Sequence, residues 1–150
     1  MTAYPDTSFL YGIYLVESHS QAAAAHAATM TESLHISGLL RYEFRQSLRF
    51  QVWRRTRNPN EGITAADAQK ALDQLEADLI SGVVLLVPCN LLEVIRLADE
   101  ISQRYTITGG HRSLDILHVA AALVLEAEEL LSFDERQRRL AVAEGLKVKP

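Results

Sequence analysis

Three aspartates stand where predicted strands meet predicted helices. Asp6 closes a short extended segment at the start of the chain, Asp134 follows an apolar run, and Asp115 lies in the first turn of an apolar helical stretch. Sites in open α/β sheets form at the carboxyl ends of the strands, so we expect these side chains to converge at one sheet edge. Aspartate is also a favoured helix cap, and for any one of the three alone that alternative stays open. Ser113 is the expected cap of the helix that carries Asp115.

A glutamate lies inside a long amphipathic helical pattern over residues 38–55. Glu43 is the only acid between Glu32 and Glu61. One interpretation is a surface glutamate that pairs with a nearby arginine, which would be worth at most about 0.5 kcal/mol. The other is an inward-facing carboxylate that joins the aspartates, and the spacing alone does not decide between the two.

Four carboxylates brought together would need a cation, because side by side in the ionised state they repel one another. The candidate set is Asp6, Glu43, Asp115 and Asp134. Mg²⁺ and Mn²⁺ prefer such oxygen ligands, and a site of this kind can activate water and stabilise the leaving oxygen of a phosphodiester. Ser8 and Ser132 lie two residues from Asp6 and Asp134, and could hold metal-bound water, orient a carboxylate or act as local turn residues.

The elements that must position these residues alternate along the chain. Strands are predicted at 2–6, 34–37, 82–88, 129–133 and 146–149, and helices at 7–18, 20–32, 38–55, 64–81, 90–105, 113–127 and 134–145. The β-branched run 82–88 reads as a buried strand, and 106–111 as a flexible loop. Strands that alternate with helices indicate one α/β domain over residues 1–150, with a mostly parallel sheet covered on both faces.

Composition limits the class of protein. Hydrophobic residues make up 48% and charged residues 23% of the 150 residues, which is typical of a soluble globular chain. The net charge of -4 does not by itself predict a nucleic-acid partner. A single cysteine excludes an internal disulfide and a multi-cysteine zinc site. Neither a signal-peptide pattern nor an apolar run of membrane-spanning length is present, so we expect a cytoplasmic protein.

The acidic segments, taken in order, resemble the motifs of PIN domains. YPDTSFL is similar to the first motif, RYEF to the second, RSLDILHVAAAL to the third and LLSFDERQRRLAVAEGLKV to the fourth. The likeness spans essentially the whole chain and is closest to VapC-type toxins of toxin–antitoxin modules. Two departures are Ser132, where the fourth motif more often has threonine, and Pro5, where an aliphatic residue is common.

The resemblance implies a PIN-like three-layer α/β/α sandwich and a Mg²⁺- or Mn²⁺-dependent endoribonuclease with one or two ions. Its catalytic and metal-binding residues would be Asp6, Glu43, Asp115 and Asp134, supported by Ser8 and Ser132. Hydrolysis would leave a 5′-phosphate and a 3′-hydroxyl. The implied partners are an RNA substrate, a cognate antitoxin and a second copy of the chain in a homodimer.

A run of arginines lies beside Glu43 on the same helix. Arg41, Arg45 and Arg49 fall at i, i+4 and i+8 and form a stripe that we expect to contact RNA or the antitoxin. Four aromatic residues interleave, namely Tyr42, Phe44, Phe50 and Trp53. An aromatic side chain could stack on a base, but for most of the four we expect a place in the core.

His118 follows Asp115 by three residues, so the two can be neighbours on one helix face. As a lone histidine on an apolar helix, it is expected to be a packed structural residue. The main rival to the nuclease is a catalytically silent PIN-like module that binds RNA or protein. The presence of all four acids argues against that rival.

Overall fold

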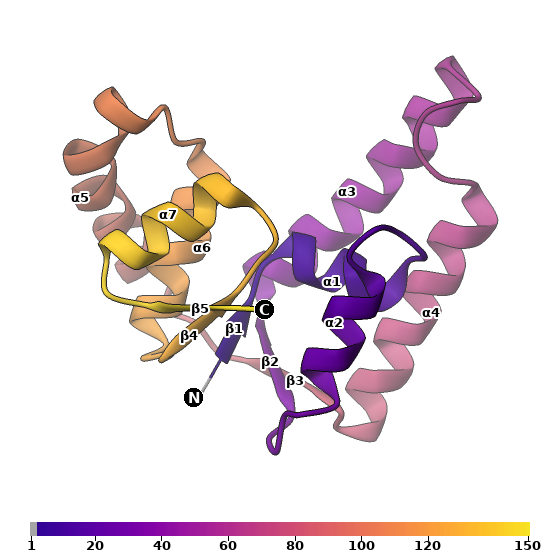
Figure 1. Ribbon diagram of the computed structural model, residues 1–150, viewed down its shortest axis with the longest axis horizontal. Coiled ribbons are helices and arrows are strands. Elements are labelled where there is room, and N and C mark those ends of the chain that lie inside the picture. Colours follow the sequence, from indigo (N-terminus) through magenta and orange to yellow (C-terminus); the bar gives the residue numbers. More distant parts are fainter. Residues whose placement is uncertain (1–2) are drawn as a thin grey trace.

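The computed structural model describes residues 3–150, and its centre is a set of parallel strands (Figure 1). Within those residues the strands are β1 (Ala3–Pro5), β2 (Leu34–Ser37), β3 (Val84–Val87), β4 (Glu129–Leu131) and β5 (Lys147–Lys149). β4 pairs in parallel with both β1 and β5, and β2 pairs in parallel with β3. β1 packs beside β2 through Tyr4, whose hydroxyl lies 2.7 Å from the Ser37 Oγ. Thr2, with which the predicted first strand began, lies outside the described residues.

Helices cover both sides of the strands, which gives the expected three-layer α/β/α sandwich (Figure 1). Their bounds are α1 (Thr7–Tyr14), α2 (Ser20–Ala27), α3 (Gly38–Arg57), α4 (Ala65–Ser81), α5 (Leu91–Gly109), α6 (Ser113–Val124) and α7 (Glu135–Ala143). Helices α1 to α4 gather on one side, and α5 to α7 on the other. Among the helices of residues 3–150, none combines the length and apolar composition that a bilayer crossing requires.

The core lies between these layers and includes the apolar side chains of the inner strands. Tyr4, Ile36 and Leu130 come from β1, β2 and β4, and all three are fully buried. Phe9 of α1 and Phe44 of α3 pack onto them from the helical side. All three residues of β1 and two of the three residues of β4 are buried, so packing fixes the carboxyl ends of both strands, which Asp6 and Asp134 follow.

Several element ends differ from the sequence prediction, most of all in α1, which stops at Tyr14 rather than at 18, and in α2, which stops at Ala27 rather than at 32. Three further local predictions differ from the structure. Residues 84–87 form an edge strand, so Leu85 and Leu86 are exposed rather than buried. Residues 106–109 continue α5 instead of forming a loop, and the helix ends at Gly110, which adopts the left-handed conformation that glycine favours. The N-cap of α6 is Arg112 rather than Ser113, because the backbone of Arg112 is extended and its carbonyl accepts the first helical hydrogen bond.

Candidate active site

The four candidate acids line one cavity of about 490 Å³. Asp6 directly follows β1 and caps α1, while Asp134 follows the β4 segment and caps α7. Glu43 comes from the second turn of α3, and Asp115 from the first turn of α6. The structure therefore shows the expected convergence of these side chains. The predicted helix-cap role and the predicted convergence are both correct for Asp6 and Asp134, since each caps a helix and also lines the cavity.

Asp6 is the most enclosed of the acids, with 2% of its surface exposed. Its carboxylate accepts hydrogen bonds from the Ser8 Oγ at 2.6 Å, the Ser132 Oγ at 2.5 Å and the Phe9 backbone N–H at 2.9 Å. Burial raises the pKa of Asp6, and the three donors only partly oppose that effect. Ser8 and Ser132 thus orient this carboxylate, one of the three roles open to them from the sequence.

Glu43 faces inward and is held from two sides. Its Oε2 accepts a hydrogen bond from the Thr7 hydroxyl and lies 2.6 Å from the His118 Nε2. Burial raises the pKa of Glu43, but the bond and charge of His118, together with the Thr7 bond, outweigh burial and leave it below the usual range. The surface-pair interpretation is wrong, because the arginines two residues to either side, Arg41 and Arg45, pair with Glu76 instead.

His118 is buried, as expected, but it also belongs to a chain of polar contacts that ends at the acid. Its Nδ1 lies 3.2 Å from the Tyr4 hydroxyl, which in turn contacts the Ser37 Oγ. Ser37 caps α3, the helix that carries Glu43. The sequence did not identify Tyr4 or Thr7 as part of the site. The one sequence signal for this chain of contacts was the spacing of His118, one helical turn after Asp115.

Asp115 and Asp134 both line the cavity, and the charge of Asp134 acts on Asp115. Burial and the negative charge of Asp134 raise the pKa of Asp115, and Glu43 adds to that repulsion. A bond from the Arg112 backbone and the charge of its guanidinium oppose the shift without cancelling it. Asp134 accepts from the backbone N–H groups of Arg136 and Gln137 at 2.8 and 3.1 Å. The cavity therefore concentrates uncompensated negative charge.

The donor set suits a hard divalent cation, since all four acids offer carboxylate oxygens. As the side chains stand, however, no three His, Cys, Asp or Glu residues within 3–150 are grouped so that they could hold an ion. The carboxylate of Asp6 is instead hydrogen-bonded to the hydroxyls of Ser8 and Ser132, and that of Glu43 to the imidazole of His118. Gln137, also in the cavity wall, has a buried side-chain nitrogen without an acceptor among the described residues. Sequence reasoning missed this donor as well.

The helix that carries Glu43 contradicts the expectation for its aromatic residues. Phe44 is buried, whereas Tyr42, Phe50 and Trp53 are 65%, 51% and 50% exposed. Core placement was therefore wrong for three of the four. In the arginine stripe, the guanidiniums of Arg41 and Arg45 already bind Glu76 at 2.8 and 3.5 Å, and Arg49 is exposed. Contact of this stripe with RNA or an antitoxin stays a prediction.

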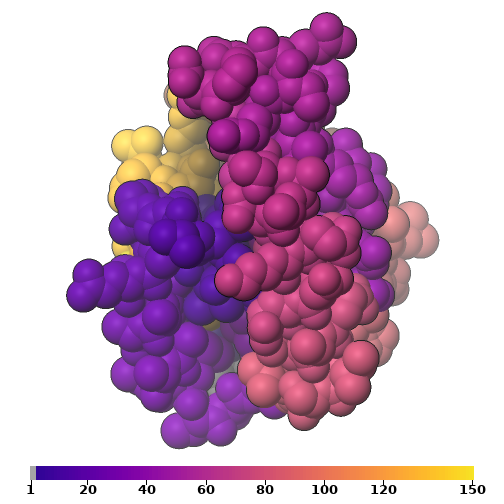
Figure 2. Space-filling view, turned by 90° about the vertical axis from the view of Figure 1, so that its right-hand side faces the viewer, coloured from indigo at the N-terminus to yellow at the C-terminus, as the bar shows by residue number. Residues whose placement is uncertain are grey.

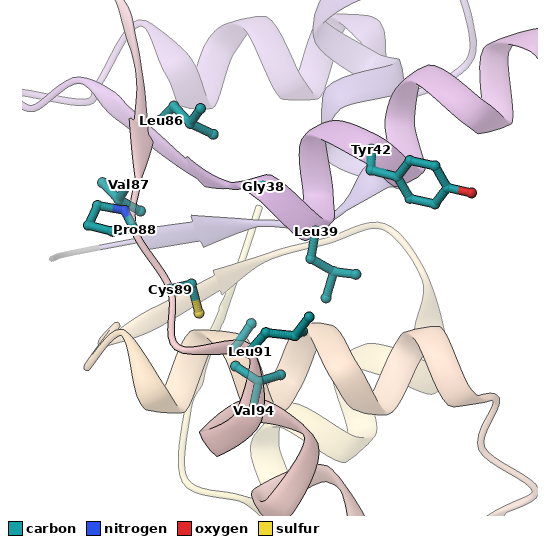
Figure 3. A pocket seen from close by; sticks show the side chains of 10 residues that line it. Gly38, Leu39, Tyr42, Leu86, Val87, Pro88, Cys89, Leu91 and Val94 are labelled. Atoms are coloured by element: carbon teal, nitrogen blue, oxygen red, sulfur yellow. The ribbon is translucent and has the colours of Figure 1, made fainter.

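A second, larger cavity of about 700 Å³ is almost entirely apolar (Figure 3). It opens between the start of α3, the end of β3 and the start of α5. Its labelled lining residues are Gly38, Leu39, Tyr42, Leu86, Val87, Pro88, Cys89, Leu91 and Val94. None of the residues that line it is acidic or basic, so this apolar groove offers a contact surface rather than groups for catalysis.

The family model of the PIN domain matches residues 3–143 of the chain. The chain therefore belongs to the PIN domain family, whose four acidic motifs were the basis of the resemblance. No curated protein sequence matches it significantly.

Solved structures share the fold over 99% of the chain at low sequence identity. FitAcB from Neisseria gonorrhoeae is 14% identical over 97% of its own chain, with a TM-score of 0.68. VapC20 of Mycobacterium tuberculosis, a toxin that cleaves the sarcin–ricin loop, is 18% identical over 100% of its chain, also at 0.68. VapBC2 from Rickettsia felis, bound to a fragment of its promoter DNA, is 13% identical over 98% of its chain, at 0.65.

Proposed function

We propose that this protein is a divalent-metal-dependent endoribonuclease that acts as the toxin of a toxin–antitoxin module. The observation that carries the proposal is the convergence of Asp6, Glu43, Asp115 and Asp134 on one cavity in a chain of the PIN domain family. The cavity offers four carboxylates to a cation, and the serine in its lining, Ser8, hydrogen-bonds to the Asp6 carboxylate rather than to a histidine, which favours hydrolysis by water over a covalent route.

Mg²⁺ or Mn²⁺ is the cofactor that this donor set fits, held as one or two ions by the four carboxylates. When bound, the ion lowers the pKa of water and offsets negative charge that develops on the phosphate. The raised pKa of Asp115 supports the assignment, because a cation bound by these acids would offset the repulsion from Asp134 that causes part of the shift. Binding would require the carboxylates to move closer together than they stand here.

The protein's own side chains have separate tasks in this reaction. Ser8 and Ser132 keep the Asp6 carboxylate in one orientation, and His118 with Thr7 does the same for Glu43. The unpaired Gln137 amide is a donor for a phosphate oxygen of the substrate. Water attacks the phosphorus in line, the bond to the 3′ oxygen breaks, and the products carry a 5′-phosphate and a 3′-hydroxyl.

The proposed partners follow from the same assignment. Among the similar structures are complexes of VapB and VapC, which supports a cognate antitoxin for this chain. A homodimer is supported by the apolar groove and by exposed leucines beside it, since large apolar patches of this kind mark interaction surfaces. The cytoplasm, where RNA is available, is the compartment we assign to the toxin.

Titration calorimetry with Mn²⁺ and an RNA-cleavage assay test the proposal together. We expect Mn²⁺ binding by the intact protein, and a loss of at least about 10-fold in affinity for Asp6→Asn and for Asp115→Asn. Asp73→Asn, which changes an exposed acid on α4, is the matched control and should bind Mn²⁺ as the wild type does.

The two assays also separate the nuclease from a silent binding module. Mn²⁺ binding with cleavage that Asp6→Asn abolishes is the expected result. If the protein binds RNA but does not cleave it, and the control variant behaves like wild type, then the protein is a catalytically silent binding module. Absence of Mn²⁺ and Mg²⁺ binding by the intact protein would rule out the metal-dependent reaction altogether.

A further inference from the structure

We propose that the far end of α3 carries a base-stacking platform for single-stranded RNA, formed by Phe50 and Trp53 and flanked by Arg49, Arg55 and Arg57. This α3 platform rests on the proposed ribonuclease function for its biological meaning, but its RNA binding is a separate physical property. It would hold an unpaired base of the strand that enters the acidic cavity.

The two rings of the platform are stacked on each other and open to water. Their centroids are 5.3 Å apart with an angle of 24° between the ring planes, and each residue is about half exposed, at 51% and 50%. The guanidinium carbon of Arg57 lies 5.7 Å from the centre of the Trp53 ring. Contacts within the cluster thus hold the rings in place, which lowers the entropy lost when a base stacks on them.

Positive charge surrounds the rings, although the whole chain has a net charge of -4. Arg49, Arg55 and Arg57 are exposed, while Arg54 is neutralised by Glu61, whose Oε2 lies 2.6 Å from the Arg54 guanidinium. Arginines can neutralise RNA phosphates while an aromatic ring takes the base, and that combination is typical of single-strand recognition. A protein partner that buried the rings would also have to compensate these three charges, so charge complementarity favours a polyanion.

The platform is continuous with the acidic cavity along one helix. Phe50 follows Glu43 by seven residues, which places it on nearly the same side of α3 and about 10.5 Å further along the axis. Gln51, its neighbour in sequence, lines the acidic cavity itself. A short single strand can therefore lie with one phosphate at the acids and a nearby base on the rings.

The surroundings leave the platform accessible. The end of α3 and its connection to α4 project beyond the other elements (Figure 1), and in the space-filling view they form the protrusion at the top of the molecule (Figure 2). The rings of Phe50 and Trp53 are also outside the hydrophobic core cluster. Their exposure thus belongs to a projecting tip.

Trp53 is the only tryptophan in the chain, so its fluorescence reports directly on the platform. We expect a short single-stranded RNA oligonucleotide to quench this emission in a saturable way in EDTA, where no cleavage occurs. An abasic oligonucleotide of the same length carries the charge without the bases and should leave the emission nearly unchanged. If RNA binds by anisotropy and the Trp53 emission does not change, the platform does not stack on bases.

Variants separate stacking, charge and self-association. Trp53→Ala and Phe50→Ala should each weaken RNA binding about 5-fold or more, because base–aromatic stacking is lost. Tyr42→Ala, an exposed aromatic of the same helix at the apolar groove, is the matched control and should bind RNA like wild type. Arg57→Gln should reduce the salt dependence of binding, whereas Arg96→Gln on α5 should not.

Three results would overturn the proposal: unchanged RNA affinity in both aromatic variants, equal quenching by the abasic strand, or a change of oligomeric state in Trp53→Ala, which would make the platform a contact between copies. Failure of the nuclease proposal has a different signature. In that case quenching by RNA persists while Mn²⁺ binding and cleavage are both absent.

Discussion

At the scale of single residues, the acidic cavity gains its character from groups that stabilise or oppose each carboxylate. Asp6 and Glu43 are surrounded by donors, so each has a fixed orientation. Asp115 differs, because burial and the charge of Asp134 outweigh its bond from the Arg112 backbone. An ionised Asp115 therefore destabilises the folded protein when no cation is bound, as is common for residues kept for function.

Replacing Asp115 by asparagine should raise the stability of the metal-free protein. We expect a gain of roughly 0.5–1 kcal/mol, kept small because the half-exposed carboxylate is screened by solvent, and a rise in Tm of about 1–3 °C by differential scanning calorimetry. Mg²⁺ should raise the Tm of the wild type more than that of Asp115→Asn. A lower Tm for the metal-free variant would contradict the proposed repulsion.

The gain in stability from Asp115→Asn should depend on pH. The pKa of Asp115 is higher in the folded protein than its unfolded value of about 3.9, so the folded state binds more protons between these two values. The contribution of this group to stability therefore falls as pH rises through that window and is fully unfavourable above it. The Tm difference between Asp115→Asn and wild type should be largest near pH 7 and should vanish at acid pH below the unfolded value.

At the scale of elements, α3 connects the three functional parts of the molecule. Its first turns line the apolar groove, its second turn carries Glu43, and its far end carries the α3 platform. The start of the helix is set by the Ser37 cap, which also contacts Tyr4 in β1. The far end is set by the turn into α4, where Gly62 lies against the backbone of Gln51.

Gly62→Ala should destabilise this turn and disturb the α3 platform. Gly62 has a φ of +67°, and a Cβ there would overlap the backbone carbonyl oxygen of Gln51. We expect a loss of about 1–3 kcal/mol in unfolding free energy, measured by urea denaturation, together with weaker RNA binding. Gly38→Ala, at the start of the same helix, meets no neighbouring atom within 4 Å and should be neutral or stabilising by up to about 1 kcal/mol. Equal stability of the two variants would show that the turn tolerates a side chain.

At the scale of the whole molecule, the uncovered apolar surface shares no lining residue with the acidic cavity. Leu86 of edge strand β3 and Leu91 at the start of α5 both line the apolar groove and are 48% and 53% exposed. An edge strand with exposed leucines is a template for association unless something covers it. The proposed homodimer places a second copy over this face and leaves the acidic cavity open to RNA.

A charge in the groove should therefore separate the subunits. We expect Leu86→Glu to shift the protein from dimer to monomer in analytical ultracentrifugation while its circular dichroism spectrum is unchanged, since the side chain is outside the core. Ile107→Glu alters a more exposed apolar residue, near the C-terminal end of α5, and should leave the dimer intact. A monomeric wild type, or a dimer that survives Leu86→Glu, would place the contact elsewhere.

The sequence by itself determined the features that depend on short stretches of chain. Asp6, Asp115 and Asp134 were found because each lies at a strand end or in a first helical turn, and parallel strands bring such positions to one edge. The resemblance to PIN domains then placed Glu43 with them. Strand and helix order could be predicted for the same reason. The errors lie mainly at element ends and in 106–109, where the glycine pair Gly109 and Gly110 favoured a loop.

Only the tertiary structure decided which groups face each other and which face water. Glu43 and His118 are 75 residues apart in the chain, and no local pattern specifies their bond. Phe50 and Trp53 have the composition of core residues, yet they project with the tip of α3 because no other element covers them. Leu86 reads as a buried strand residue, but its strand lies at the sheet edge. Whether a side chain is buried depends on how the layers assemble, and it cannot be predicted from the hydrophobic periodicity of one segment.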